Sequence, residues 1–267
     1  MNRIEKTTEN LGKKSLNSGG VFKKALVGYF MAGEFPHAQT LKIMHESTAS
    51  GLDIIELGFP FSDPTADGGT IQVSARESLK NGTKIADVFA LAKEFRQENQ
   101  HTPLILMGYF NIVFQYGEEN FLKKCSECGI DGLIIVDLPI EESLYFEKIA
   151  EKYNIFIIQI VSFLTDEERF LKIQARAKGF IYLVSTLGVT GQTLPMIHRI
   201  EQYISSMHSK LPIFVGFGIS SPEIAKSVAQ YSSGVIVGSY FIQSARNDPS
   251  LGNLKSDIGK IKVAINL

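Results

Sequence analysis

Three acidic residues near position 56 are the first candidates for chemistry in this chain. The run Leu52–Leu57 is mostly aliphatic and predicts a buried β-strand, yet Glu56 stands near its end. Burial disfavours a charged carboxylate, so the pKa of Glu56 should rise toward neutrality, where the group can transfer protons. A Gly-Phe-Pro break and a loop with Asp63 and Asp67 follow. The alternative is a solvated glutamate at a strand end, followed by a turn with a capping aspartate.

Glycine turns follow the last apolar runs of the chain. Two of them contain serine, Gly216-Phe-Gly-Ile-Ser220 and Gly238-Ser239, and a third is Gly188-Val-Thr-Gly191. Glycine lets backbone N–H groups approach an oxyanion closely, and a following helix start presents further N–H groups. Such turns also occur as ordinary connections between strands and helices. Three of them at strand ends favour a phosphate on the ligand; the expected contacts are Gly191, Gly218, Gly238 and Ser239.

Aromatic residues accompany these turns and the acidic segment. They are Tyr29, Tyr109, Tyr182, Phe59 and Phe217. Taken one at a time, each is more often a packing residue than a ligand contact. Together with the expected phosphate contacts, they indicate a ligand that has a flat apolar end and a phosphorylated tail.

Short β-branched runs alternate with longer stretches of helical period along the chain. The expected strands are Ala25–Met31, Leu52–Leu57, Pro103–Met107, Gly132–Val136, Ile155–Val161, Phe180–Val184, Ile213–Gly216 and Gly234–Val237. Helical patterns between them include His37–Ala49, Lys84–Gln97, Glu118–Cys128, Glu141–Tyr153, Asp166–Ala175, Ile197–His208 and Pro222–Gln230. Eight apolar strands alternating with helices predict a closed α/β TIM barrel, a (β/α)₈ fold. An open dinucleotide-binding sheet is disfavoured, since no G-x-G-x-x-G motif follows the first strand.

The barrel is expected to form a single domain over residues 1–267, because no linker or charge block divides the chain. Residues 1–20 should be an N-terminal extension. Within it, Arg3–Lys14 has Ile4 and Leu11 on one side and predicts a helix that covers the bottom of the barrel.

Composition narrows the choice of partners and location. Lys and Arg number 27 against 28 Asp and Glu, so neither a nucleic acid nor an anionic membrane is expected as a partner. No apolar run approaches the roughly 20 residues of a membrane span, and Met1–Lys14 lacks the apolar core of a secretory signal. A cytoplasmic enzyme is therefore expected.

Metal and Schiff-base chemistry are not expected. Cys125 and Cys128 form a C-x-x-C pair at the end of a helical pattern, and the five histidines show no ligand spacing that would complete a zinc site. The cysteines are therefore interpreted as reduced structural thiols. No lysine or histidine falls at the carboxyl end of an expected strand, which is where barrel enzymes have their active sites.

The segment from Ile55 to Gln72, with Glu56-Leu-Gly-Phe-Pro-Phe-Ser-Asp-Pro64 and Ala66-Asp-Gly68, closely resembles the tryptophan synthase alpha chain family. Further matching segments follow in family order as far as Ser239: Met107–Asn111, Gly132–Pro139, Tyr182–Gly191, Gly216–Ser220 and Gly238–Ser239. The resemblance implies a TIM barrel that cleaves indole-3-glycerol phosphate to indole and glyceraldehyde 3-phosphate, a retro-aldol reaction that needs no cofactor and no metal. It also implies a β subunit that consumes the indole in an α₂β₂ heterotetramer of tryptophan biosynthesis.

The resemblance also implies roles for particular residues. Glu56 matches the acid–base carboxylate, and Asp67 matches the acid that hydrogen-bonds the indole N–H. Tyr182 would position Glu56 and the substrate, and Thr190 would hydrogen-bond Asp67 when the loop after the sixth strand closes. The aromatic residues Tyr29, Tyr109 and Phe217 are expected to position the substrate as well.

Some residues depart from the family pattern or carry weaker expectations. Gly69 stands where the family usually has proline, which should loosen the loop that carries Asp67. The segment after Gly191 is short. Asp63 is expected to shape a turn or face a partner, and Asp137 to support the site or its loop.

Other functions stay open at this point. One alternative is a stand-alone indole-3-glycerol-phosphate lyase. Another is a catalytically slow barrel that mainly binds and activates a β subunit, because loop closure often sets turnover. A third, an indole-glycerol-phosphate synthase, is disfavoured because it would want lysines at strand ends.

Overall fold

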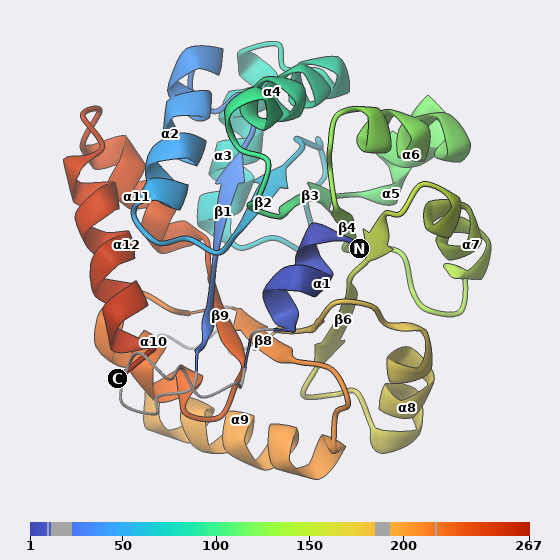
Figure 1. Ribbon diagram of the computed structural model, residues 1–267, viewed down its shortest axis with the longest axis vertical. Helices are drawn as coiled ribbons and strands as arrows, with labels where there is room; N and C mark the ends of the chain where they lie inside the picture. Colours follow the sequence, from blue (N-terminus) through green and yellow to red (C-terminus); the bar gives the residue numbers. More distant parts are fainter. Residues whose placement is uncertain (10, 12–22, 185–192, 217) are drawn as a thin grey trace.

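A ring of parallel strands surrounded by helices makes up the computed structural model, which describes residues 1–9, 11, 23–184, 193–216 and 218–267 (Figure 1). The strands are β1 Ala25–Met31, β2 Ile54–Gly58, β3 Leu104–Gly108, β4 Gly132–Ile135, β5 Phe156–Ile157, β6 Gln159–Ser162, β7 Ile181–Val184, β8 Ile213–Gly216 and β9 Gly234–Val237. Their hydrogen-bonded order is β5-β4-β3-β2-β1-β9-β8-β7-β6. The predicted TIM barrel is confirmed.

The barrel closes through an interrupted strand. Strand β5 pairs with β4 and β6 pairs with β7, and only Ile158 separates β5 from β6. The N–H of Ile158 still donates to the carbonyl of Leu133 at 2.9 Å. The two short strands therefore occupy the fifth position of an eight-position ring. The prediction of one unbroken strand over Ile155–Val161 was wrong at its centre.

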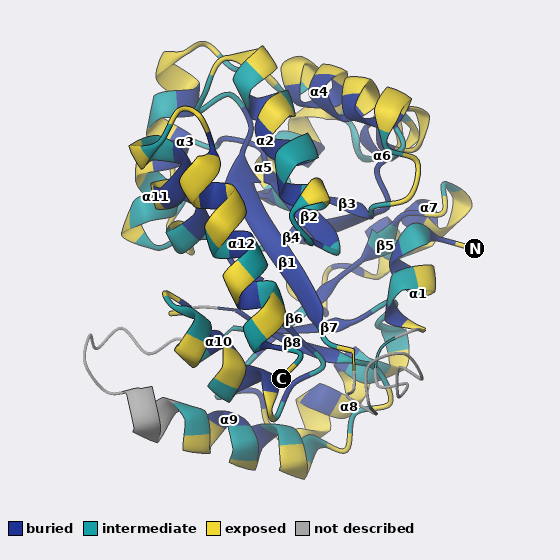
Figure 2. Cartoon of the chain, turned by 60° about the vertical axis from the view of Figure 1, so that its left-hand side comes forward, coloured by how far each residue is buried: buried dark blue, intermediate teal, exposed yellow. Residues whose placement is uncertain are grey.

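Helices cover the outside of the ring and, in the case of α1, its amino end. They are α1 Arg3–Thr8, α2 His37–Ala49, α3 Gly69–Lys80, α4 Ile85–Glu98, α5 Phe110–Tyr116, α6 Glu118–Glu127, α7 Leu144–Lys152, α8 Glu167–Arg176, α9 Thr193–Met207, α10 Pro222–Ala229, α11 Ser239–Asn247 and α12 Gly252–Ala264. Figure 2 shows buried strands at the centre and exposed residues on the outer faces of the helices, as expected when both faces of a parallel sheet are covered. No helix of the described residues is long and apolar enough to cross a membrane.

Alternation along β2 decides which side chains reach the barrel interior. Ile55 and Leu57 pack outward into the core under the helices, whereas Ile54 packs inside the ring. Successive side chains of a strand point to opposite faces, so Glu56 and Gly58 face inward with Ile54. Glu56 therefore lies one step above the apolar interior, toward the carboxyl ends of the strands.

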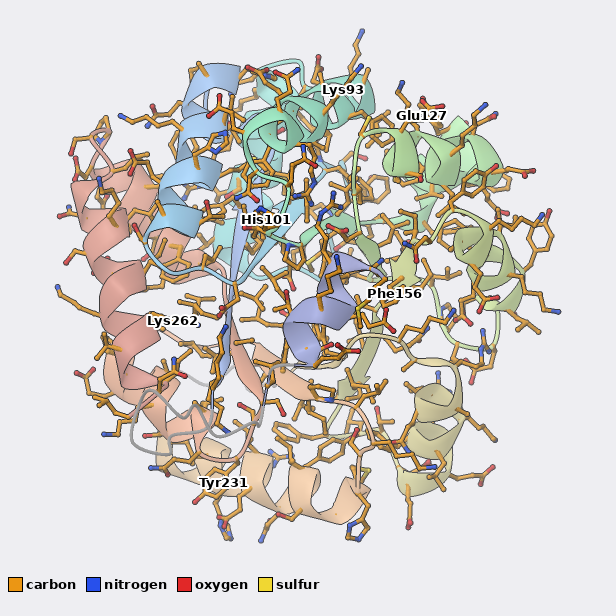
Figure 3. The ribbon with its side chains drawn as sticks, viewed as in Figure 1. Lys93, His101, Glu127, Phe156, Tyr231 and Lys262 are labelled. Carbon is orange, nitrogen blue, oxygen red and sulfur yellow. The ribbon has the colours of Figure 1, made fainter. Side chains whose placement is uncertain are left out.

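Helix α1 lies across the amino end of the ring (Figure 1). Ile4 is fully buried among inward-facing side chains, and the labelled Phe156 lies beside α1 in Figure 3. The expected helix Arg3–Lys14 is shorter, because α1 ends at Thr8 and residues 12–14 lie outside the described residues. The β-branched pair Thr7 and Thr8 favours helix only weakly, which agrees with this end point.

A buried ion-pair network fixes this same end of the barrel. Asp131, just before β4, accepts hydrogen bonds from Arg96 Nη2 at 2.7 Å, Arg3 Nη1 at 2.8 Å and the Leu104 N–H at 2.9 Å. Asp131 and Arg96 are 4% and 6% exposed. Burial lowers the pKa of Arg96 to about 10, and the charge of Asp131 opposes that shift. The network ties α1, α4, β3 and β4 together.

Candidate active site

A cavity of about 350 Å³ opens at the carboxyl ends of the strands. Its walls come from β1, β2, β3, β7 and β9, from the start of α3 and the start of α11, and from the turn after β8. The lining residues are Tyr29, Glu56, Asp67, Gly68, Ile71, Met107, Tyr182, Gly218, Ile219, Ser220, Ile236, Gly238, Ser239, Tyr240 and Gln243. The cavity thus brings together acidic, aromatic and glycine-turn residues from distant parts of the chain.

Glu56 is the most deeply buried acid of this cavity. Its side chain is 0% exposed, and neither carboxyl oxygen has a hydrogen-bond partner among the described residues. Burial penalises the charged form and raises the pKa of Glu56 to about 8. The carboxyl group therefore carries a proton at neutral pH and can donate it to a ligand.

Asp67 lies in the turn just before α3. Burial raises the pKa of Asp67 to about 6, and the hydrogen bond from the Tyr109 hydroxyl opposes that rise. Tyr109 Oη is 3.3 Å from Asp67 Oδ2 and accepts a hydrogen bond from the Ala66 N–H at 3.0 Å. Gln72 Nε2 donates to the Asp67 carbonyl at 2.9 Å. Because its pKa lies below that of Glu56, Asp67 is the acid that is ionised at neutral pH.

Tyr29 on β1 and Tyr182 on β7 both line the cavity. Tyr29 is the register partner of Glu56 across β1 and β2. Burial, followed by the nearby carboxyl groups of Asp67 and Glu56, raises the pKa of Tyr29 well above its ordinary value. Burial and Glu56 do the same for the pKa of Tyr182. Both hydroxyls therefore stay protonated beside the acids.

Two glycines make room for these tyrosine rings. A Cβ atom on Gly58 would lie 2.1 Å from the Tyr29 hydroxyl oxygen. A Cβ atom on Gly216 would lie 2.4 Å from the Tyr182 hydroxyl oxygen. Distances this short do not occur between real atoms, so any side chain at either position would displace a ring that shapes the cavity.

The remaining expected aromatic residues lie further from the cavity. Tyr109 does not line it; its ring stacks on Phe61 with centroids 4.9 Å apart and reaches the site through Asp67. Phe59 is buried in the core under the helices, beside Phe121. Phe217, Thr190 and Gly191 lie outside the described residues.

Another part of the cavity wall is built from glycine turns and helix starts. Gly218, Gly238 and Ser239 line it, as does Ser220. Gly238 and Ser239 are the N-cap and first residue of α11, so the N–H groups of its first turn have no partner within the helix. Ser221 caps α10, accepting from the Ile224 N–H at 3.3 Å. This part can hold an anion through backbone N–H groups and the helix dipole.

A family model for the tryptophan synthase alpha chain matches residues 19–263. The chain belongs to the tryptophan synthase alpha chain family.

Individual members of the family are similar over most of their length. The tryptophan synthase alpha chain of Thermoanaerobacter sp. (strain X514) is 42% identical over 245 residues, which cover 91% of this chain and 90% of that one. The crystal structure of the alpha chain from Legionella pneumophila subsp. pneumophila superposes with a TM-score of 0.88 at 36% identity, covering 99% and 97% of the two chains. A chain of the tryptophan synthase α₂β₂ complex from Pyrococcus furiosus gives a TM-score of 0.80 at 32% identity, with 90% and 98% covered.

Several cavity residues of this family member were not indicated by the sequence patterns. They are Gly68, Ile71, Met107, Ile236, Tyr240 and Gln243. The sequence held a signal for two of them, Gln243 and Met107. Gln243 stands four residues after Ser239, one helical turn along α11, and Met107 is an inward position of β3 by alternation.

Two other acids lie away from the cavity lining. Asp63 is exposed and accepts a hydrogen bond from the Ser62 hydroxyl. Asp137 accepts from the Phe110 N–H at 2.7 Å and so supports the start of α5. Among the residues that the structure describes, no group of three or more His, Cys, Asp or Glu side chains is arranged to hold a metal ion.

Proposed function

We propose that the cavity around Glu56 is the site at which this tryptophan synthase alpha chain cleaves indole-3-glycerol phosphate to indole and glyceraldehyde 3-phosphate. One observation carries the proposal. A buried carboxyl group, with no hydrogen-bond partner among the described residues, opens into a cavity that the start of α11 also lines. A proton donor and an anion site thus line the same small cavity.

Glu56 supplies the proton that makes the indole ring a leaving group. In its protonated form it donates to ring carbon C3, and the ring becomes an indoleninium cation. The carboxylate formed in that step then accepts the proton of the side-chain hydroxyl. The bond between C3 and the side chain breaks, its electron pair neutralises the ring, and the hydroxyl carbon becomes the aldehyde of glyceraldehyde 3-phosphate. A pKa of about 8 keeps Glu56 protonated until the substrate arrives.

Asp67 is the second acid of the mechanism. With a pKa of about 6 it is mostly ionised at neutral pH, so it accepts a hydrogen bond from the indole N–H and offsets the positive charge of the cation. Tyr109 holds the Asp67 carboxylate and the Ala66 N–H at the same time, which orients the turn. The two acids thus have different protonation states at the same pH.

The glycine turns bind the substrate phosphate. The N–H groups at the start of α11, with Gly218 and Ser239, face the anion. Gly191, in the expected closing loop, belongs to the same proposal, and so do the roles of Thr190 and Phe217.

A β subunit is the partner in this proposal, as in the α₂β₂ complex named for the Pyrococcus relative. Large apolar side chains are exposed on α5 and α7, the helices that follow β3 and β4: Phe114, Tyr116, Leu144 and Tyr145. Phe114 is 63% exposed. Large exposed apolar patches often mark protein interfaces, which makes α5 and α7 the candidate surface for the β subunit.

A cytoplasmic location belongs to the same proposal. Cys125 and Cys128 are free thiols and both are buried. Unpaired cysteines are usual in a reducing compartment.

The test is a coupled assay for glyceraldehyde 3-phosphate released from indole-3-glycerol phosphate, with and without the cognate β subunit. We expect slow release by the chain alone and faster release with the β subunit. Full activity that ignores the β subunit would favour a stand-alone lyase. Absent cleavage combined with stimulation of the β subunit's own reaction would favour a slow barrel that activates its partner.

A pair of variants locates the partner surface in the same assay. Phe114→Asp should reduce the stimulation by the β subunit without changing the slow activity of the chain alone. Val263→Asp is the matched control, since Val263 is 60% exposed on α12, across the barrel from α5 (Figure 1). Equal loss of stimulation in both variants would contradict the proposed surface.

A further inference from the structure

The two ends of the cavity are carried by two neighbouring helices. Asp67 and Gly68 lie at the start of α3, and Gly238 and Ser239 lie at the start of α11. Both helices pack against β1 and against each other, and Figure 2 shows them side by side at one edge of the barrel. The distance between the acidic end and the phosphate end therefore depends on how α3 and α11 are held together.

Arg246, in the last turn of α11, bridges these elements. Its Nε is 2.5 Å from Oε1 of Glu34, which lies in the loop after β1. Its Nη2 donates to the Ser74 hydroxyl of α3 at 3.0 Å. Ser74 is fully buried and donates in turn to the Thr70 carbonyl at 3.1 Å, in the first turn of α3. A continuous chain of contacts thus joins the loop after β1, α11 and the start of α3.

Glu34 is an unusual residue to bury at this point. Its side chain is only 5% exposed, and its second oxygen, Oε2, is buried with no hydrogen-bond partner among the described residues. A buried ion pair contributes little to stability, since removing two charges from water offsets their attraction. Its best-attested use is to fix one arrangement against others.

Two further hydrogen bonds hold the far end of α3 to the loop after β1. Ser78 donates to the Ala32 carbonyl at 2.6 Å, and Asn81 donates to the Gly33 carbonyl at 2.9 Å. Near the cavity, Gln243 Nε2 lies 3.5 Å from the Thr70 hydroxyl, and Ile242 of α11 packs in one apolar cluster with Ile71 and Ala75 of α3. Among the described residues, Arg246 makes the shortest hydrogen bond between the two helices, 3.0 Å to Ser74.

We propose that Arg246, held by Glu34, is a positioning residue that couples phosphate binding at the start of α11 to the placement of Asp67 at the start of α3. The inference rests on the proposed function of the cavity. A phosphate that draws the first turn of α11 inward shifts Arg246, and Arg246 carries α3 and the Asp67 turn with it. Occupation of the phosphate end then prepares the acidic end for the indole ring, as linked sites require.

The experiment measures that coupling with two partial ligands, indole for the ring and glycerol 3-phosphate for the tail. Calorimetry gives the Kd of indole with and without saturating glycerol 3-phosphate. In the wild-type chain we expect the phosphate to tighten indole binding by at least ~5-fold. Arg246→Met keeps the length of the side chain but removes its charge and its hydrogen-bond donors. In this variant the ratio of the indole Kd without glycerol 3-phosphate to the indole Kd with it should fall to about 1. The Kd of each ligand measured by itself should change by less than ~2-fold. The turnover number should fall ~10-fold with little change in KM.

Two further variants keep the test decisive. Glu34→Gln preserves the shape of the side chain and should reduce the coupling in the same direction, even if Arg246→Met folds poorly. Arg76→Met is the matched control, because Arg76 is an exposed arginine of α3, and it should leave the coupling unchanged.

The outcomes separate this inference from the proposed function. Wild-type chain that cleaves the substrate but shows no coupling overturns the positioning role alone. Coupling that survives in both Arg246→Met and Glu34→Gln, with only the melting temperature lowered, also overturns it and leaves the ion pair a purely structural tie. Wild-type chain that neither binds the two ligands nor cleaves the substrate overturns the proposed function itself.

Discussion

Two buried carboxyl groups lie at opposite ends of the same barrel, and their surroundings differ completely. At the amino end, Asp131 accepts hydrogen bonds from two arginines and a backbone N–H. At the carboxyl end, Glu56 is equally buried but neither of its oxygens has a partner among the described residues. The acid at the amino end is paired with two arginines, whereas the acid at the carboxyl end has no partner among the described residues and lines the cavity.

This difference separates a structural acid from a chemical one. Paired charges hold elements in place, and breaking such a pair leaves the other charge buried without compensation. An unpaired buried acid costs stability but keeps a proton near neutral pH, which is what proton transfer to a substrate requires. Replacing the carboxyl group by an amide should therefore reduce turnover at position 56 and reduce stability at position 131.

Glu56→Gln is expected to have the largest effect on activity. The amide resembles the protonated acid in shape but cannot donate a proton to C3, so the turnover number should fall about a thousandfold. At pH 7 the unfolded wild-type chain releases the Glu56 proton that the folded chain keeps, so the melting temperature of Glu56→Gln should not fall below the wild-type value. Single-turnover release of glyceraldehyde 3-phosphate measures the first effect and calorimetry the second. Near-normal turnover in this variant would remove Glu56 from the mechanism.

Asp131→Asn makes the matching change at the other end. The loss of the carboxylate leaves Arg96 buried without its counter-charge, which should lower the free energy of unfolding by about 3 kcal/mol. Turnover per folded molecule should be unchanged, since the network lies at the opposite end of the barrel. Urea unfolding, with activity corrected for the folded fraction, tests both statements. If Asp131→Asn kept full stability but lost turnover, Asp131 would be a residue of the chemistry and not a structural acid.

The pH dependence of the wild-type chain should distinguish the two acids of the cavity. Asp67 must be ionised and Glu56 protonated, so kcat/KM should rise through pH about 6 and fall through pH about 8. A plain sigmoid with a single limb would contradict the separate protonation states.

Stability should follow the same pKa shift of Glu56. Its folded pKa is raised from 4.5, so the folded chain binds more protons than the unfolded chain between pH 4.5 and about 8. The contribution of this group to stability is therefore fully present below pH 4.5 and is lost as pH rises through about 8. Urea unfolding of wild type and Glu56→Gln at pH 5, 7 and 9 measures this contribution. The free energy of unfolding of wild type should fall relative to that of Glu56→Gln as the pH rises.

Gly69→Pro should have the smallest effect and a stabilising one. Gly69 is the first residue of α3, its φ is not positive, and an added Cβ would meet no described heavy atom within 4 Å. Gly68 before it is extended, with φ −70° and ψ 158°, as a residue before proline should be. Proline should therefore stabilise by ~0.4–1 kcal/mol by restricting the unfolded chain.

Gly82→Pro is the matched control for that substitution. An added Cβ on Gly82 also meets no described heavy atom within 4 Å, but its φ of +78° excludes proline. Thermal melts should therefore move in opposite directions for the two variants. A lower melting temperature for Gly69→Pro would show that the start of α3 needs the freedom of glycine.

The fold was largely predictable from the sequence because both faces of a parallel strand are buried. The predicted bounds of β1, Ala25–Met31, match the structure, since all of its side chains are buried and the run is continuously apolar. The break at Ile158 was not predictable, because this residue is as apolar and β-branched as Ile157 and Ile160 and only strand pairing reveals it. The start of α11 at Ser239 was interpreted only as a turn, although the same residues begin a helix.

The site was predictable where position along a strand decides direction. Glu56 and Tyr182 stand near strand ends, and alternation points them inward to the cavity. The bond between Tyr109 and Asp67 joins residues from separate loops, and the link of Arg246 to Glu34 joins the two ends of the chain, so no local pattern could indicate either. The expected roles of Thr190, Gly191 and Phe217 stay predictions, because these residues lie outside the described ones.

Gly58 and Gly216 have a consequence for how this cavity can evolve. Each leaves the room that one tyrosine ring occupies, so a single added methyl group at either position forces the ring aside. Replacement of Gly58 can be tolerated only together with a change at Tyr29, and replacement of Gly216 only with a change at Tyr182. The two pairs should therefore show strong epistasis, and new substrate shapes should arise through paired substitutions, while single changes at either glycine are eliminated.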